Sequence, residues 1–460
     1  MIRISASLIL VFCALFTVNS QAEMNYPEIT IEPFPIMTWV PPALTAEQLG
    51  WYDDAGFNVM FIYPEEEAYQ KMKKHWDGNW MVFKEWNTKG YNYKTMSDFH
   101  ADDPKRIGFM LGDEPTTPEI EKYVEQYEYL RRRHPQDICI VNMFPSYVSE
   151  TRLGSTFRQY VETYYEKLNP RYSSLDHYPC FRFNVDSPSF YHDLEIQREL
   201  SLKNNCKQFG FVQVYSSYKD RNVSGSDLAW QINSFLAYGC KGLWYFYFRH
   251  PVCGINELAQ KEALSHKTEG LAINYNNGGM REEYYEPVFK FGSGVLDSND
   301  QKGPRYDDAA AINKETLCWG KVLLELENIK VRHIRGFGES FVPVGTDEFA
   351  GNVGRFGAAE EYIAGVDARN NVLSMGYIVS YFEDKDNRPY VMIVNKRHGE
   401  YMSRDGGSLK TVVSFTDDVK NVYAVSNTTG REEQVSLNNS NACVEELGGG
   451  GAVLYRVETK

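Results

Sequence analysis

The chain has 460 residues, a length that favours two domains over a single one. Hydrophobic residues make up 43% of it, which is enough to bury large cores and excludes an intrinsically disordered chain. The formal net charge of −14 argues against the strongly basic footprint of a nucleic-acid-binding protein, so no nucleic-acid partner is expected.

The first residues have the pattern of a signal peptide. Arg3 gives a positive start, residues 8–18 form an apolar run, and residues 20–22 offer a small-residue cleavage site. Cys13 follows the bulky Phe12, where a lipoprotein signal has a small residue, so soluble export is favoured over a lipid anchor. We expect residues 1–22 to be removed and the protein to be periplasmic or extracellular. No later segment is long and apolar enough to predict a membrane span.

Short apolar runs alternate with amphipathic stretches up to about residue 248, which is the pattern of consecutive βαβ units. The runs expected to be strands are 36–39, 58–63, 80–84, 107–111, 138–143, 173–175, 209–215 and 242–246. Helices are expected at 45–55, 118–133, 155–167, 189–204 and 225–238, with a closing helix at 307–326. This order predicts a (β/α)8 TIM barrel over residues 23–330. An open doubly wound sheet is the alternative, but the chain lacks the Gly-rich phosphate turn typical of that fold.

Helical periodicity stops near residue 330, and β-type runs separated by turn signals follow. Strands are expected at 341–344, 372–381, 390–395, 410–415, 421–426 and 452–457. The fold class predicted is therefore α/β, a TIM barrel followed by a small all-β domain, a β-sandwich over residues 331–460.

The seven cysteines beyond the signal segment have irregular spacing, which does not indicate a disulfide framework. Most are expected to be buried small hydrophobic residues, with one bridge, such as Cys180 to Cys206, left open. The chain has no CxxC pair and no His cluster of metal-ligand spacing, so neither a metal nor a cofactor is expected.

The fourth predicted strand ends in two adjacent carboxylates, Asp113 and Glu114. Reactive groups of a TIM barrel project from the C-terminal ends of its strands, which makes Glu114 the first catalytic candidate and Asp113 a substrate-binding one. The alternative is that acids here cap the helix starting near residue 118. Asp113 or Glu119 is placed to do that, which leaves Glu114 without a capping role.

The sixth predicted strand ends in a second carboxylate, Asp176, followed by His177 and Tyr178. Asp176 is therefore the second catalytic candidate, and its two neighbours are expected to hydrogen-bond the substrate. The alternative for Asp176 is a turn residue stabilised by Asx geometry before Pro179.

The remaining strand ends supply further substrate-binding candidates. Gln213, on the seventh strand, can hydrogen-bond a hydroxyl group but cannot act as a nucleophile. Trp244 on the eighth strand and Trp39 on the first are expected to stack on substrate, with a buried barrel aromatic as the equal alternative. Tyr63 ends the second strand, and Glu85 follows the third as a reserve carboxylate.

Other hydrolytic chemistries lack their motifs here. The chain has no GxSxG elbow, no P-loop and no HExxH, and its Cys and His residues do not indicate a paired nucleophile. Two carboxylates flanking a cleft are what glycosidic cleavage needs, one protonated and one acting as nucleophile or base. The pattern thus favours a carbohydrate substrate; it gives no indication of the oligomeric state.

Several segments resemble the large retaining clan of (β/α)8 glycoside hydrolases. Residues 107–115 are similar to its fourth strand, which ends in an Asn-Glu or Asp-Glu pair, and the resemblance implies that Glu114 is the acid/base. Residues 230–246 look like the last helix and strand of β-galactosidase-like barrels. Residues 390–395 and 448–457 resemble the C-terminal β-domain of such enzymes.

One departure from that clan bears on function. The clan keeps its nucleophile, a Glu, at the end of the seventh strand, where this chain has Gln213. Either Asp176 is the partner of Glu114, or Gln213 replaces a nucleophile in an inactivated enzyme, or the protein binds glycans without cleaving them. The first is favoured, so the expectation is an exported O-glycosidase, with a non-catalytic carbohydrate-binding protein on a glycosidase fold as the alternative.

Overall fold

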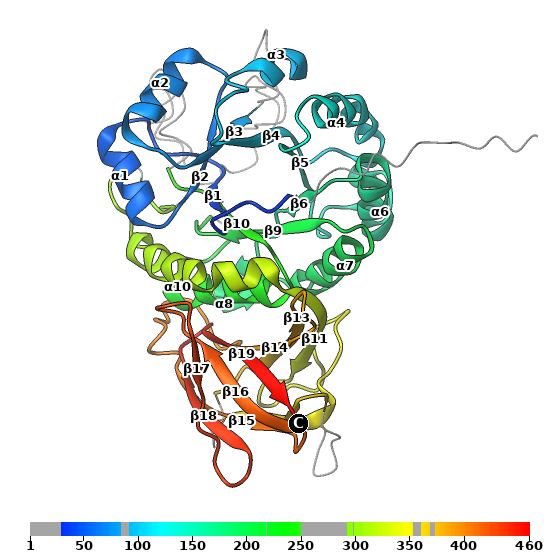
Figure 1. Cartoon of the computed structure of the whole chain (residues 1–460), viewed down its shortest axis with the longest axis vertical. Helices are drawn as coiled ribbons and strands as arrows, with labels where there is room; N and C mark the ends of the chain where they lie inside the picture. The colour runs from blue at the N-terminus through cyan, green and yellow to red at the C-terminus, as the bar shows by residue number, and fades with distance from the viewer. Residues whose placement is uncertain are drawn as a thin grey trace, which may run out of the picture.

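The computed structural model describes residues 29–83, 92–217, 219–249, 292–297, 299–352, 360–368 and 373–460. Over these residues the chain forms a ring of parallel strands and helices followed by antiparallel sheets (Figure 1). Among them, no helix combines the length and the apolar character needed to cross a membrane.

Eight parallel strands form one sheet in the order β1-β10-β9-β6-β5-β4-β3-β2. The end strands β1 and β2 meet where the Asn58 N–H donates to the Ile36 carbonyl at 2.9 Å, so the sheet is a nearly closed barrel. The strands are β1 Ile36–Thr38, β2 Val59–Ile62, β3 Asn79–Phe83, β4 Arg106–Asp113, β5 Ile138–Met143, β6 Tyr172–Leu175, β9 Lys207–Gln213 and β10 Gly242–Phe246. All eight predicted barrel strands are confirmed, and so is the barrel.

Helices cover the outside of the barrel (Figure 1). They are α1 Ala46–Asp54, α2 Glu66–His75, α3 Tyr93–Asp98, α4 Glu121–Arg133, α5 Glu150–Leu153, α6 Phe157–Leu168, α7 Phe190–Lys203, α8 Gly225–Ala237 and α10 Tyr306–Glu325. The six predicted helices are confirmed, whereas α2, α3 and α5 were not predicted. The reason is visible in α2, which is strongly polar and buries only Met72, so its sequence has too few apolar residues to indicate a buried face.

Apolar side chains pack on both the inner and the outer face of the barrel strands. Met37, Phe61, Met110, Phe211 and Trp244 belong to the cluster that fills its interior. A larger cluster lies between the strands and the surrounding helices. Because the interior is packed with apolar side chains, polar groups that point inward are confined to its ends.

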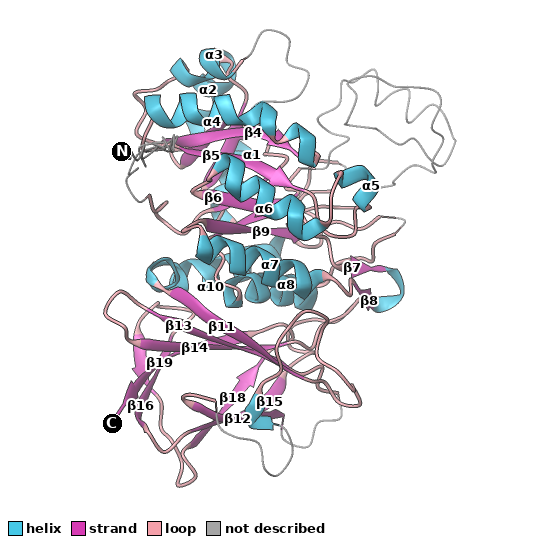
Figure 2. Ribbon diagram, turned by 90° about the vertical axis from the view of Figure 1, so that its right-hand side faces the viewer, coloured by secondary structure: helices cyan, strands magenta, loops and turns pink. Residues whose placement is uncertain are grey.

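The antiparallel part begins with β11 at Glu327. One sheet has the order β11-β13-β14-β19-β16-β17 and the other β12-β15-β18, and buried apolar side chains from both form one core (Figure 2). The strands are β11 Glu327–Ile334, β12 Ile363–Ala368, β13 Tyr377–Glu383, β14 Pro389–Asn395, β15 Leu409–Phe415, β16 Val419–Val425, β17 Glu432–Gln434, β18 Ala442–Leu447 and β19 Ala452–Thr459. The predicted strand at 341–344 is wrong, because Phe341 is 84% exposed and Val344 72% exposed in a loop.

Helices α8 and α10 lie between the barrel strands and the six-stranded sheet (Figures 1 and 2). Asn233 of α8 donates to the Gly450 carbonyl at 2.8 Å, and Trp319 of α10 donates to the Val425 carbonyl at 2.8 Å. The barrel and the sheets thus share one buried interface.

The disulfide left open by the sequence is not formed. Cys180 and Cys206 are both free and buried. Burial raises the pKa of the Cys206 thiol to about 12, so it behaves as a small apolar side chain.

Candidate active site

A β-bulge at the end of β4 turns Asp113 into the barrel. Met110 points inward, so strict alternation would direct Gly112 inward and Asp113 towards the helices. The register shifts between Met110 and Gly112, and Asp113 comes to lie opposite Asn142. Gly112 then faces α4, where a Cβ would lie 2.2 Å from the Tyr123 hydroxyl, so only glycine fits there.

Asn142, on β5, holds the end of β4 in place. Its side-chain amide donates to Asp113 Oδ1 at 3.1 Å and accepts from the Ser174 hydroxyl at 2.8 Å. Its carbonyl accepts the N–H of Glu114 at 2.9 Å. Glu114 has a φ of +47°, a left-handed conformation that is uncommon outside glycine and recurs at functional sites. The turn, and not the strand pleat, therefore aims the Glu114 side chain.

Asp176 follows β6 and is buried beside Glu114. It is 8% exposed, and its Oδ1 has no hydrogen-bond partner in the part of the chain that the structure describes. Its carboxyl group and that of Glu114 are close enough to share a hydrogen bond. A buried carboxyl oxygen without a partner is costly, and such groups are found where a ligand or a reaction uses them.

Burial changes the ionisation of all three carboxyl groups. Burial and the Asp113 charge raise the pKa of Glu114 to about 8, against the opposing effects of Arg152 and of the hydrogen bond with Asp176. Burial raises the pKa of Asp113 to about 6, although the Asn142 amide stabilises its anion. Burial and the charges of its two acidic neighbours raise the pKa of Asp176 well above the usual range. Near neutral pH the cluster therefore retains protons that exposed carboxyl groups would lose.

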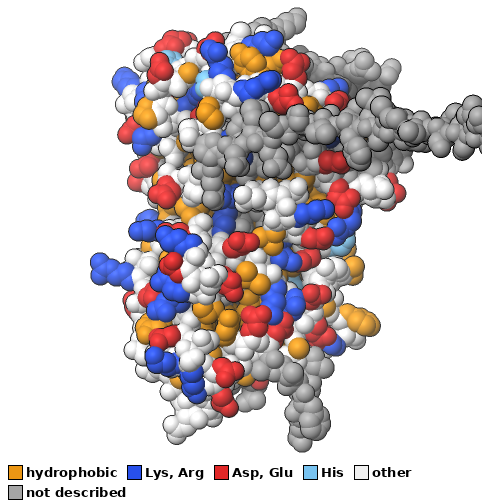
Figure 3. Space-filling view, turned by 45° about the vertical axis from the view of Figure 1, so that its right-hand side comes forward, with side chains coloured by type: hydrophobic (Ala, Val, Ile, Leu, Met, Phe, Trp, Pro, Cys, Tyr) orange, Lys and Arg blue, Asp and Glu red, His pale blue; other side chains and the backbone are white. Residues whose placement is uncertain are grey.

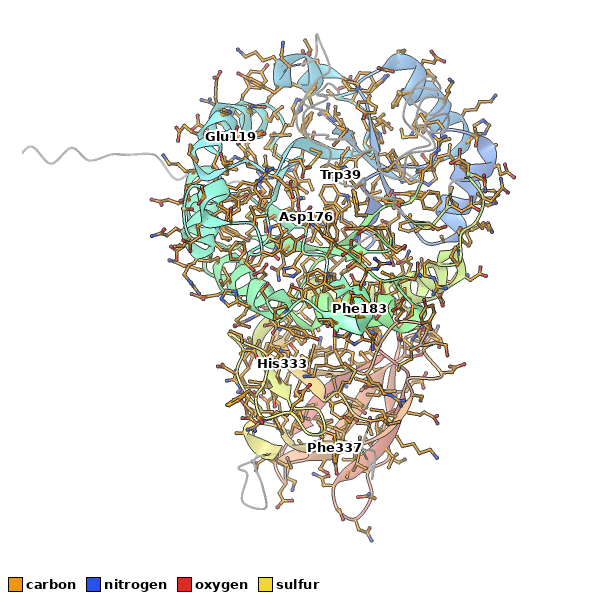
Figure 4. The ribbon with its side chains drawn as sticks, turned by 180° about the vertical axis from the view of Figure 1, so that it is seen from behind. Trp39, Glu119, Asp176, Phe183, His333 and Phe337 are labelled. Atoms are coloured by element: carbon orange, nitrogen blue, oxygen red, sulfur yellow. The ribbon has the colours of Figure 1, made fainter. Side chains whose placement is uncertain are left out.

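Asp113, Glu114 and Asp176 together are called the carboxyl cluster. Aromatic side chains lie at the same end of the barrel. Trp39 is partly exposed above Trp244, with ring centroids 5.5 Å apart, and Figure 4 shows Trp39 and Asp176 together inside the barrel. Tyr63 is partly exposed and packs edge-on against Phe83 at 5.5 Å. These rings give the mouth of the barrel flat apolar faces.

Tyr147 and Tyr178 interact electrostatically with the carboxyl cluster and are not fully buried. Tyr178 is partly exposed and packs against the Phe246 ring at 5.4 Å. Tyr147 is 49% exposed. Burial of its hydroxyl end and the charges of Asp176 and Glu114 raise the pKa of Tyr147 well above the usual range. Its phenol therefore lies within the electrostatic reach of both catalytic candidates.

The structure gives three predicted substrate-binding side chains other partners. Gln213 is fully buried, and its amide both accepts from the Cys180 N–H at 2.8 Å and donates to the Cys180 carbonyl at 3.4 Å. Trp244 is fully buried and stacks on Phe211 at 5.1 Å. His177 is 1% exposed, with both ring nitrogens hydrogen-bonded inside the protein. None of the three offers exposed surface to a sugar. Glu85 lies outside the described residues.

The capping role considered for the acids near residue 118 belongs to Glu119. Its carboxylate accepts from the Thr116 N–H at 3.0 Å and from the Thr116 hydroxyl at 2.8 Å. These bonds and Lys122 lower the pKa of Glu119 to about 2. Figure 4 shows Glu119 among the outer helices, well away from Asp176. Glu114 is thus free of the structural role that competed with catalysis.

The sequence did not single out Asn142, Ser174 or Tyr147. Asn142 and Ser174 lie within predicted strands. A polar residue near the C-terminal end of a barrel strand was the signal that could have identified each of them. Tyr147 lies in the loop after β5, and nothing in the sequence places that loop beside Asp176. Within the described ranges, no group of three or more His, Cys, Asp or Glu residues is arranged to hold a metal ion.

Comparisons with known proteins reach the fold only. No family model matches the chain, and no curated protein matches it. It is similar to the family 30 subfamily 8 xylanase of Clostridium acetobutylicum, with a TM-score of 0.41, 10% identity and 94% and 96% of the two chains covered. It is also similar to the α-galactosidase of Saccharomyces cerevisiae, with a TM-score of 0.44, 7% identity and 93% and 97% coverage. An arabinofuranosidase gives a TM-score of 0.43, 8% identity and 94% and 96% coverage. By name, these three proteins are glycoside hydrolases.

Proposed function

We propose that the protein is an exported glycoside hydrolase that cleaves O-glycosidic bonds of a poly- or oligosaccharide. The observation that carries this proposal is the carboxyl cluster, buried at the C-terminal mouth of the barrel and bordered by partly exposed aromatic rings. Two acids with different ionisation are what glycosidic cleavage requires. Export rests on the signal pattern of residues 1–22.

Glu114 is the proposed general acid. With a pKa raised to about 8, it is largely protonated near neutral pH and can donate to the leaving oxygen. Asp113 is more readily ionised, and its anion, held by Asn142, helps to keep the Glu114 proton in place. Asp113 is thus a positioning residue.

Asp176 is the proposed second carboxylate. It acts as nucleophile or as base, and either role requires its anion. The transition state of glycosidic cleavage carries positive charge on the sugar ring, which favours ionisation of a carboxyl group beside it. Glu114 and Asp176 lie within hydrogen-bonding reach of each other. Glycosidases keep their carboxyl groups about 5 Å apart when retaining and about 6.5–9.5 Å apart when inverting, so the bound sugar would have to separate them.

Aromatic faces supply the binding surface. Trp39, Tyr147 and Tyr178 are partly or half-exposed near the carboxyl cluster, and flat apolar rings suit the C–H faces of sugars. Figure 3 shows acidic and basic side chains interspersed on one face of the molecule, without a large field of one sign.

A screen of a broad polysaccharide panel for released reducing ends tests this proposal. Cleavage by the natural sequence, lost in Glu114→Gln and kept in Glu119→Gln, is the expected result. Gln213→Glu is expected to bring no activity of its own, because the Gln213 amide is engaged with the Cys180 backbone. Tight glycan binding without cleavage by any of these proteins would establish the non-catalytic alternative.

A further inference from the structure

Apart from the carboxyl cluster, a serine, a histidine and an aspartate form a chain of hydrogen bonds with the histidine in the middle. His177 Nδ1 is 2.6 Å from Asp193 Oδ2, and His177 Nε2 is 2.6 Å from the Ser187 hydroxyl. The Asp193 carboxyl group thus contacts Nδ1 of the imidazole, and the Ser187 hydroxyl contacts Nε2. That is the arrangement in which an imidazole withdraws a proton from a serine nucleophile. The chain has no GxSxG elbow, so no sequence motif points to this group.

Hydrogen bonds to Asp193 set the proton positions. Burial alone would raise its pKa, but hydrogen bonds from His177, His192 and the Ser146 N–H hold the pKa of Asp193 below its usual range. An ionised Asp193 accepts a proton from Nδ1. The Nε2 lone pair of a neutral imidazole then faces the Ser187 hydroxyl as an acceptor.

Ser187 is held at the start of α7. Its N–H donates to the Pro179 carbonyl at 2.8 Å, and its carbonyl accepts the N–H of Phe190, the first residue of the helix. The first N–H groups of a helix have no acceptor within the helix, and the helix dipole favours negative charge there. The dipole of α7 therefore favours negative charge beside the segment that carries the hydroxyl.

Tyr147 connects this group to the carboxyl cluster. Its ring packs edge-on against the His177 ring at 5.0 Å, while its phenol is within reach of the charges of Asp176 and Glu114. Ser187 is only 6% exposed, so a substrate group that reaches its hydroxyl must be small. A glycan that carries a short acyl substituent is the kind of substrate that would contact both the carboxyl cluster and the Ser187 hydroxyl.

We propose that Ser187, His177 and Asp193 form a second catalytic site, which hydrolyses small O-acyl esters, of the acetate class, on sugars. The acyl-transfer chemistry is independent of the proposed glycosidase, whereas the choice of a sugar ester rests on it. Ser187 Oγ attacks the ester carbonyl, and its proton passes to His177 Nε2. The C–O bond to the sugar breaks, and the sugar oxygen takes the proton. Water then attacks the acyl-serine, His177 takes one of its protons and passes it to Ser187 Oγ as the acyl–oxygen bond breaks, and the acyl group leaves as acetic acid, which ionises in solution.

Hydrolysis of p-nitrophenyl acetate and of peracetylated xylose by the full chain, together with labelling by a fluorophosphonate, tests the proposal. The expected result is turnover above buffer, a mass increase mapped to Ser187, and a loss of at least about 100-fold in Ser187→Ala. Ser189→Ala is the matched control, because its hydroxyl lies 3.5 Å from that of Ser187, while His177 Nε2 pairs with Ser187. It should keep the label and the rate.

Glu114→Gln separates the two sites. Retained ester hydrolysis and labelling in that variant, whatever its effect on glycan cleavage, supports an independent acyl-transfer site. Absence of both turnover and Ser187 labelling in the natural sequence overturns the proposal. So does an unchanged rate in Ser187→Ala, or a label on another serine. Labelling of the natural sequence decides the matter even where a variant fails to fold.

Discussion

At the residue scale, the protonation of Glu114 and the exposure of Tyr147 determine what the candidate site can do. Burial and the charge of Asp113 keep Glu114 protonated near neutral pH, and its left-handed backbone sets the direction of its side chain. A rise of one in the pKa of a group corresponds to about 1.4 kcal/mol of preference for its protonated form. A group of this kind also affects the stability of the whole protein.

The free energy of unfolding is expected to fall as the pH rises from 5 to 8. The folded-state pKa of Glu114 is about 8 and its ordinary value is 4.5, so the folded protein holds more protons across this range and loses stability as they dissociate. Between pH 5 and pH 8, the decrease in the free energy of unfolding should be smaller in Glu114→Gln by at least about 2 kcal/mol. Urea unfolding at both pH values measures it. His398, Asp113 and Asp176, whose pKa values are also raised, contribute in the same direction and are kept in the variant. The difference between the two proteins therefore measures Glu114 together with its effect on the two neighbouring carboxyl groups. Identical slopes in the two proteins would refute the assignment.

Tyr147→Ala should weaken glycan binding by up to about tenfold and leave the melting temperature within about 2 °C. An aromatic contact is worth about 0.5–1.5 kcal/mol, and a side chain that is 49% exposed contributes little to folding. Isothermal titration with the best glycan of the panel measures the affinity. Tyr401→Ala, at a tyrosine that is 82% exposed, is the control and should bind normally. Equal affinities in the two variants would remove Tyr147 from the binding surface.

At the element scale, the end of β4 shows what sequence can and cannot predict. The strand itself is predictable because its apolar run has the length and neighbours of a barrel strand. The bulge that turns Asp113 inward is not, since it arises from pairing with β5 and from the closeness of Tyr123 to Gly112. Nor is the left-handed conformation of Glu114 encoded by residue type.

The same limit applies to the other strand ends. The residues after each strand could be identified, and Asp176 and Glu114 do meet at one end of the barrel. Burial of Gln213 and His177 depended on contacts with Cys180, Asp193 and Ser187, which lie in α7 and in the segment before it. The sequence does not show how close these residues come to the strand ends. The expected strand at 341–344 was wrong for a related reason, because an apolar run becomes a strand only where another strand pairs with it.

Gly112→Ala should reduce glycan cleavage at least about tenfold and destabilise the fold by about 1–3 kcal/mol. The new Cβ would lie 2.2 Å from the Tyr123 hydroxyl, so α4 or the bulge must shift, and the bulge positions Asp113 and Glu114. Gly50→Ala is the control: nothing lies within 4 Å of its Cβ position in α1, and it should stabilise the protein by about 0.5–1 kcal/mol. Activity and denaturation of both variants are compared. Full activity in Gly112→Ala would show that the bulge does not position the acids.

At the scale of the whole molecule, a buried polar contact joins the barrel to the antiparallel sheets. The His398 ring stacks on Trp230 at 3.7 Å, and its Nε2 lies 3.0 Å from Asp186 of the strand pair β7 (Cys180–Phe181) and β8 (Val185–Asp186). Arg221 pairs with both Asp186 and Asp227 in the same region. Charges buried together in this way hold the two parts in one arrangement.

His398→Ala should cost about 2–4 kcal/mol and lower the temperature of a single unfolding transition that includes barrel and sheets. Loss of the ring removes both the stacking on Trp230 and a charge partner of Asp186. Differential scanning calorimetry measures the transition. His192→Ala is the control, because this histidine of α7 has a side chain that is 38% exposed, and its loss should change stability less. Two well-separated transitions in the natural sequence would show that the parts unfold independently.

The most direct test of the general-acid role is the dependence of cleavage on the leaving group. A general acid matters for a poor leaving group and hardly at all for a good one. Kinetics of Glu114→Gln on a substrate of the identified sugar with a sugar leaving group, and on the 2,4-dinitrophenyl glycoside, separate these cases. We expect a loss of at least about 100-fold on the first and less than about tenfold on the second, with a normal melting temperature at neutral pH or below. Equal losses on both substrates, or no loss on either, would show that Glu114 is not the general acid.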